Sequence, residues 1–178
     1  SYTITGSVNE WVVAPSIENS TYGDAHKAPV AQALYGEYKV EYCVKGSSQF
    51  SEDIPTLAGT YIARFTTTDM NATTLATEIE FTIAPKQVEV EWSALAFVYN
   101  GMAQAPTATV KGVYGETVEL AISGAKTNVG TYTATASLAD DNYTLTNTTV
   151  EYTIAAKAVD VPVLDVNSFV FTGETFTS

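Results

Sequence analysis

The sequence predicts an all-β chain, built as two tandem β-sandwich domains in an elongated array. Three observations support this fold class. Apolar residues alternate with Thr and Glu over short stretches, turns rich in Gly and Asn separate those stretches, and two motifs recur at a fixed offset. Only 16% of residues are charged, while β-branched and aromatic residues are abundant, which is typical of strand-rich proteins.

The alternation is clearest over residues 79–83, 88–92, 132–138 and 150–154. In each stretch one face is apolar and the other carries mainly Thr or Glu, as in half-buried antiparallel strands. No ten-residue window shows a helical stripe. Short, regularly spaced strands without helices favour a β-sandwich. A β-grasp arrangement is the alternative, and it requires a helix.

The repeat is seen in two motifs, a turn that enters a strand and a closing strand. Ala58-Gly59-Thr60-Tyr61 recurs as Val129-Gly130-Thr131-Tyr132, and Phe81-Thr82-Ile83-Ala84 recurs as Tyr152-Thr153-Ile154-Ala155. Both offsets are 71 residues. A constant offset over two separated motifs indicates an internal repeat rather than chance composition.

The repeat divides the chain into four expected segments. These are the last strand of a preceding repeat (1–8), repeat one (9–86), repeat two (87–158) and the opening strands of a truncated third repeat (159–178). The joint between repeats one and two is short, because only four residues separate Ile83 from Val88. One of them, Pro85, restricts the backbone. We therefore expect a stiff tandem rather than flexibly linked domains.

The charge of the chain excludes some classes of partner. Eight basic residues stand against 20 acidic ones, for a net charge of -12. Nucleic acids and anionic membranes attract positive patches, so neither is an expected partner. No run of 18 apolar residues is present, so we expect no membrane insertion in this fragment, and any anchor lies outside it.

The single cysteine, Cys43, excludes an intramolecular disulfide. Small secreted eukaryotic domains usually carry several, so a cysteine-poor extracellular protein is more typical of bacteria. Along residues 38–45, Cys43 falls on the polar face with Lys39, Glu41 and Lys45. We expect it to be an inert, tolerated thiol.

The recurring turns resemble those of one family. Tyr22-Gly23-Asp24 or Tyr99-Asn100-Gly101 comes early, Ala-Pro and Gly-Thr-Tyr follow, then Asp140-Asp141-Asn142-Tyr143, and Tyr152-Thr153-Ile154-Ala155 closes the unit. This order is similar to the MBG/YDG-type immunoglobulin-like repeats of bacterial cell-surface, adhesin-like proteins. Repeat one departs from it at Asp69-Met70-Asn71-Ala72.

The resemblance implies an immunoglobulin-like sandwich for each repeat, in an extracellular protein on the bacterial cell surface. It supplies no ligand and no catalytic residues. The function it implies is a non-catalytic structural stalk or spacer, whose partners are neighbouring repeats of the same chain.

No pattern of residues indicates catalysis, a cofactor or a metal. A catalytic triad would have to use His26, the sole histidine, which lies in a turn-like stretch. Zinc sites need more His or Cys than the chain has. The carboxylate pairs Asp140/Asp141 and Glu52/Asp53 match no calcium loop. We therefore expect no enzyme activity and no catalytic, cofactor-binding or metal-binding residues.

The two repeats differ most in the middle. Tyr35 and Tyr114 are 79 residues apart, whereas Gly59 and Gly130 are 71 apart, so repeat one has about eight extra residues between these points. They fall around the polar run 45–53, and inserted loops often carry binding sites. The alternative function is therefore a module that binds host glycan or protein. Its candidate residues are Lys45, Ser47, Ser48, Gln49, Phe50, Glu52 and Asp53.

Overall fold

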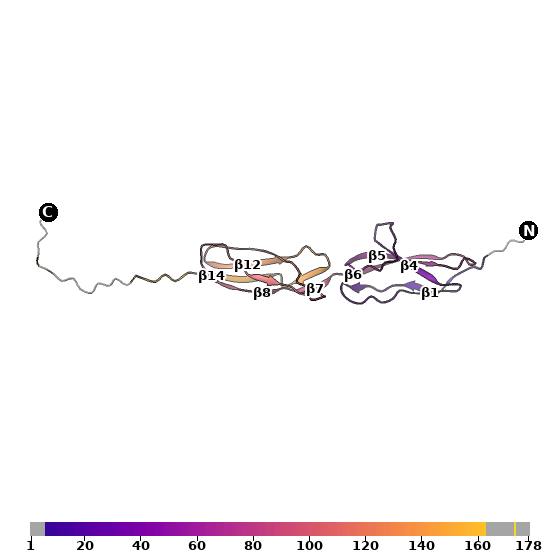
Figure 1. Cartoon of the computed structure of the whole chain (residues 1–178), viewed down its shortest axis with the longest axis horizontal. Coiled ribbons are helices and arrows are strands. Elements are labelled where there is room, and N and C mark those ends of the chain that lie inside the picture. Colours follow the sequence, from indigo (N-terminus) through magenta and orange to yellow (C-terminus); the bar gives the residue numbers. More distant parts are fainter. Residues whose placement is uncertain (1–5, 163–172, 174–178) are drawn as a thin grey trace, which may run out of the picture.

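The computed structural model describes residues 6–162 and Gly173, and these residues form fourteen strands and no helix. The predicted all-β class is confirmed. The strands lie in two groups placed end to end along the long axis of the molecule (Figure 1). No helix among the described residues could cross a membrane. Residues 1–5 of the strand expected over 1–8, and most of the expected third repeat, lie outside the described residues.

Group one comprises six strands: β1 (Trp11–Ser16), β2 (Ser20–Thr21), β3 (Val30–Ala33), β4 (Tyr38–Val44), β5 (Gly59–Thr67) and β6 (Ala76–Ala84). They form a four-stranded sheet in the order β2-β6-β5-β4 and a two-stranded sheet of β1 and β3. The alternating side chains of β5 and β6 fill the core. Ala63, Phe65 and Ile83 are fully buried, with Tyr61 and Phe81 beside them.

Group two comprises eight strands: β7 (Lys86–Glu89), β8 (Glu91–Ser93), β9 (Ala96–Val98), β10 (Thr107–Thr109), β11 (Ala121–Ser123), β12 (Gly130–Ser137), β13 (Tyr143–Thr146) and β14 (Thr149–Ala155). A four-stranded sheet has the order β11-β12-β14-β9, and β8 pairs with β10 and β7 with β13. The core contains Val90, Val110 and Tyr143 in one cluster, and Tyr152 and Ile154 in another.

Both groups contain the same parallel pairing of strands. The last strand of each pairs in parallel with a short early strand, Thr21 with Ala84 in group one and Val98 with Ala155 in group two. Backbone hydrogen bonds extend both pairings: the Tyr22 N–H donates to the Ala84 oxygen at 2.8 Å, and the Tyr99 N–H donates to the Ala155 oxygen at 2.9 Å. The remaining pairings of the two larger sheets are antiparallel.

The face of β4 that alternation assigns to Lys39, Glu41, Cys43 and Lys45 is covered at Cys43. Cys43 is buried, with only 5% of its surface exposed. Its Sγ atom lies 3.5 Å from the carbonyl oxygen of Ser47, in the turn that follows β4. By contrast Val44, which alternation assigns to the apolar face, is 60% exposed. The loop after β4 therefore reverses the expected burial of these two residues.

Candidate functional site

The strand registers locate the inserted residues. β4 pairs Val40 with Phe65, and β11 pairs Ile122 with Ala136. Because Phe65 and Ala136 lie 71 residues apart, Val40 corresponds to Ile122 at an offset of 82. The connection from β4 to β5 is therefore eleven residues longer than its counterpart (82 − 71). The connection before β4 is shorter in group one, which is why sequence spacing alone shows a difference of eight.

The inserted loop turns back along β4. The Ser47 N–H donates to the Val44 carbonyl at 2.9 Å, and Gly46 has a φ of +88° in this turn. The chain then returns so that Ser51 and Tyr42 exchange two backbone hydrogen bonds, of 2.6 and 2.9 Å. The loop projects from the side of group one near β4 and β5 (Figure 1). Its returning half thus occupies part of the edge of β4.

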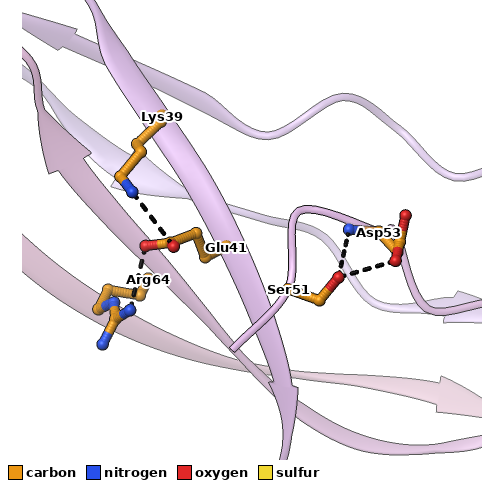
Figure 2. Close-up of polar contacts among 5 residues, drawn as sticks. All are labelled: Lys39, Glu41, Ser51, Asp53 and Arg64. Carbon is orange, nitrogen blue, oxygen red and sulfur yellow. Dashed lines mark hydrogen bonds and ion pairs between the residues drawn. The ribbon is translucent and has the colours of Figure 1, made fainter. Parts of the chain in front are cut away.

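A charged cluster lies under the loop. Arg64 and Lys39 approach the carboxylate of Glu41 at 3.0 and 3.2 Å (Figure 2). The hydrogen bond from Arg64, followed by that from Lys39, lowers the pKa of Glu41 below its usual value. The Phe50 ring covers the Arg64 guanidinium, with 3.8 Å between Cζ and the ring centroid. Phe50 therefore fixes the loop to the sheet through a cation–π contact.

The other predicted loop residues make mainly local contacts. Lys45 forms an ion pair with Glu80 at 2.9 Å. The hydroxyl of Ser47 accepts the N–H of Gln49 at 3.1 Å. Asp53 accepts the Ser51 hydroxyl at 2.8 Å and donates its N–H to that oxygen at 3.0 Å (Figure 2). Ser48 and Glu52 are exposed. The structure therefore spreads the seven candidates along a surface loop and does not gather them around one cavity.

An adjacent pocket of about 230 Å³ lies on the other side of β4. Its floor includes Tyr42 and Phe81, whose rings meet edge to face at 6.1 Å, and burial raises the pKa of the Tyr42 hydroxyl. Its walls include Ile17, Pro29 and Ile54. Sequence reasoning missed this pocket because Ile54 lies just past the polar run 45–53. The apolar Ile54, directly after the polar pair Glu52 and Asp53, is the signal that could have revealed it.

The rim of the pocket is polar. Lys27 pairs with Glu18 at 2.5 Å, and the Ser20 hydroxyl lies 2.9 Å from Nδ1 of His26. Among the described hydrogen bonds, His26 has no carboxylate partner, so the Ser-His-Asp arrangement is not assembled in residues 6–162. Within that range and Gly173, no three His, Cys, Asp or Glu side chains gather in a metal-binding group.

A second contact region joins the two groups of strands. Tyr22, just after β2, lies between Tyr143 and Tyr114, at 5.3 and 6.3 Å between ring centroids. Tyr22 packs against the core clusters of both groups. The Tyr143 hydroxyl accepts the N–H of Val113 at 3.1 Å and donates to Glu116 at 2.5 Å.

These contacts alter two pKa values at the junction. Burial, followed by the hydrogen bond to Glu116, raises the pKa of Tyr143 to about 12. The same hydrogen bond is the main cause of a lowered pKa for Glu116. At neutral pH the phenol is therefore a proton donor and the carboxylate an acceptor, which is the arrangement that orients the Tyr143 ring under Tyr22.

Polar contacts surround the aromatic ones. Lys86 forms an ion pair with Asp24 at 2.9 Å, and the Ala58 N–H donates to Oδ1 of Asn142 at 2.8 Å. A Cβ placed on Gly23 would lie 2.7 Å from the Val113 side chain, so this side chain of group two packs directly on the Gly23 backbone of group one. Residues from five separate parts of the sequence thus meet at this junction.

Comparison with protein-family models, with curated proteins and with solved structures finds no match to this chain.

Proposed function

We propose that this chain is part of a non-catalytic stalk of an extracellular, adhesin-like protein on the bacterial cell surface. In this proposal its tandem repeats hold another part of the protein away from the cell. The observation that carries the proposal is the junction at Tyr22, where the two groups share aromatic packing, an ion pair and a hydrogen bond from the Ala58 N–H to the Asn142 side chain.

The two groups are proposed to be copies of one immunoglobulin-like β-sandwich repeat. Their parallel pairings, Thr21 with Ala84 and Val98 with Ala155, occur at constant offsets of 77 for the early strand and 71 for the last strand. The β-grasp alternative needs a helix, and residues 6–162 contain none. Lys86 pairs with Tyr143 in group two, which favours ending repeat one at Pro85, one residue before the expected boundary at 86.

A stiff junction follows from its contacts. Independent rotation of the groups would expose the rings of Tyr22 and Tyr143 and break the Lys86–Asp24 ion pair. Aromatic pairs of this geometry contribute about 0.5–1.5 kcal/mol each beyond their burial. The exposed ion pair adds little by itself, about 0–1 kcal/mol. The aromatic cluster is therefore the main source of the proposed stiffness.

The charge is compatible with this role. A net charge of -12 keeps an extended surface protein soluble and disfavours binding to nucleic acid or anionic lipid. The proposed partners are neighbouring repeats of the same chain, and no cofactor is proposed.

The test of the stalk is whether the groups tumble together. Backbone ¹⁵N relaxation of the full chain is expected to give both groups one common, anisotropic rotational diffusion tensor, and small-angle scattering is expected to give a single elongated shape. Separate correlation times for group one and group two would contradict the proposal.

A second candidate function is a binding module that uses the loop of group one. The observation that favours it is that the loop lengthens only one group and leaves Ser48, Gln49 and Glu52 exposed. A matched test replaces residues 45–58 with Thr127-Asn128-Val129, the corresponding short connection of group two. Glycan and host-protein arrays are then probed with both proteins. Signals are expected for the natural chain and not for the chain with the shortened loop.

A further inference from the structure

The counterpart of the pocket in group two is closed. Gln104 and Lys126 exchange two backbone hydrogen bonds there, of 2.8 and 3.0 Å. The Tyr152 hydroxyl lies within hydrogen-bond distance of the carbonyl oxygens of Gln104 and Gly124, at 3.0 and 2.8 Å. In group two, the paired backbones of Gln104 and Lys126 and the buried side chain of Tyr152 therefore occupy the place that the pocket has in group one.

The corresponding residues in group one follow from the offsets. Gln104 corresponds to Lys27, because the flanking Tyr22/Tyr99 and Pro29/Pro106 pairs both have an offset of 77. Lys126 corresponds to Val44 at the offset of 82 that the β4 register requires. Tyr152 corresponds to Phe81 at the offset of 71.

None of the three closing contacts is present in group one. The Val44 carbonyl accepts Ser47 within the inserted loop, at 2.9 Å, and the returning loop pairs with Tyr42. Phe81 has no hydroxyl to reach across the gap. Neither backbone group of Lys27 pairs with another backbone group among the described residues. Because of the insertion, the edge of β4 pairs with its own loop. The pocket is therefore left open, and the backbone of Lys27 beside it has no backbone partner among the described residues.

We propose that this pocket binds an extended segment of a partner polypeptide. The segment would pair its backbone with the free edge at Lys27, as Lys126 pairs with Gln104 in group two, and place one apolar side chain over Tyr42 and Phe81. Addition of a strand to an exposed edge gives affinity through main-chain bonds and specificity through a side-chain pocket.

The composition and size of the pocket favour a peptide over a sugar. Its walls are mainly aliphatic or aromatic, and Ile54 at its mouth is 54% exposed. The volume of about 230 Å³ is below the roughly 300–1,000 Å³ of drug-sized ligand sites, and it fits a single large side chain. The rim pairs Lys27 with Glu18, so it selects no strongly charged group, and the net charge of -12 repels acidic segments.

This site is separate from the junction at Tyr22, and its occupancy does not depend on the stalk function. Loss of peptide binding would leave the relaxation test of the junction unchanged, so the two proposals can fail independently.

The test uses the ¹⁵N-labelled full chain and capped pentapeptides Thr-Thr-X-Thr-Thr, in which X is Leu, Phe, Ser or Asp. The Leu and Phe peptides are expected to shift the amides of Lys27, Ala28 and Ile54 saturably, with dissociation constants of roughly 1 mM. The Ser and Asp peptides are expected to bind at least about tenfold more weakly, since the pocket then gains no apolar contact.

The chain offers a matched pair of variants. Ile54 and Leu57 lie in the same loop and are 54% and 56% exposed, but only Ile54 lines the pocket. Ile54→Ser is expected to weaken the Phe peptide several-fold, and Leu57→Ser is expected to leave it unchanged, with both proteins equally folded.

Four results with added ligand would overturn the proposal, and a fifth concerns the protein alone. They are no saturable shift with any of the peptides, equal binding of the Ser and Phe peptides, equal loss in Leu57→Ser and Ile54→Ser, and saturation of the same amides by methyl glucoside in place of the peptides. Concentration-dependent shifts of these amides without peptide would also overturn it, because they would identify a second copy of this chain as the occupant.

Discussion

The ring of Tyr22 meets the ring of Tyr143 edge to face, with 5.3 Å between centroids and 85° between planes. These residues belong to different groups of strands and lie far apart in the sequence. Their contact joins the two cores, since Tyr22 packs against both. The proposed stalk therefore depends most on this pair.

Replacing Tyr22 with Ala should loosen the junction. The substitution removes two edge-to-face contacts, with Tyr143 and Tyr114, worth about 1–3 kcal/mol together. The ¹⁵N relaxation data should then require separate correlation times for the two groups. Tyr99→Ala is the control, because Tyr99 occupies the corresponding position at the far end of group two and is 40% exposed. If Tyr22→Ala and Tyr99→Ala gave the same correlation times, Tyr22 would not be the residue that holds the junction.

Replacing Gly23 with Ala should disturb the same junction sterically. Gly23 and Gly101 both have a φ of +80°, so Ala at either position incurs a left-handed penalty of about 1–2 kcal/mol. Only at Gly23 does the added Cβ clash, at 2.7 Å from Val113, whereas nothing lies within 4 Å of it at Gly101. Thermal unfolding should show a larger loss for Gly23→Ala, by about 1–3 kcal/mol. If Gly101→Ala lost as much stability as Gly23→Ala, the clash with Val113 could not be the cause of the loss.

Replacing Tyr143 with Phe should destabilise group two. The hydroxyl accepts from Val113 and donates to Glu116, so its loss leaves a partly buried N–H without its partner, at a cost of about 1–3 kcal/mol. Urea unfolding followed by far-ultraviolet circular dichroism measures this loss. Tyr132→Phe is the matched control, because its hydroxyl makes one exposed bond to Val129 at 3.3 Å and should cost little.

Stability should fall in acid partly through Glu116. Its pKa in the folded protein is lowered from 4.5, first by the hydrogen bond from Tyr143, so the folded state holds the ionised form more strongly than the unfolded chain does. This contribution is present above the unfolded pKa and is lost as pH falls through the lower folded value. In urea titrations between neutral pH and about pH 3, Glu116→Gln should flatten the acid limb. If the acid limb of the stability profile were the same in Glu116→Gln, protonation of Glu116 would not contribute to the loss of stability in acid.

Shortening the loop should uncover Cys43. The thiol is buried because the turn at Ser47 folds over it, and a chain carrying Thr-Asn-Val in place of residues 45–58 lacks that cover. Disulfide-exchange labelling should be slow in the natural chain and fast in the shortened one, with circular dichroism as the check on folding. Slow labelling of the shortened protein would mean that the sheet itself protects Cys43.

The period-two alternation predicted the inner faces of β6, β12 and β14. Phe81 and Ile83 alternate with Glu80 and Thr82, and the structure buries the first pair. This inference succeeds because side chains of a strand point to opposite faces whatever the rest of the chain does. The all-β class was predictable from the sequence for the same reason.

Only the tertiary structure decided the burial of Cys43, the junction at Tyr22 and the pocket at Ile54. Each depends on where another segment comes to rest: the turn at Ser47 against Cys43, Tyr22 against Tyr143, and Ile54 at the pocket that Phe81 also lines. Alternation carries no information about such pairings, because it records which face of a strand is apolar and not which segment covers it. The sequence by itself could locate the extra residues of group one, but the backbone bonds of the returning loop set what those residues cover and what they leave open.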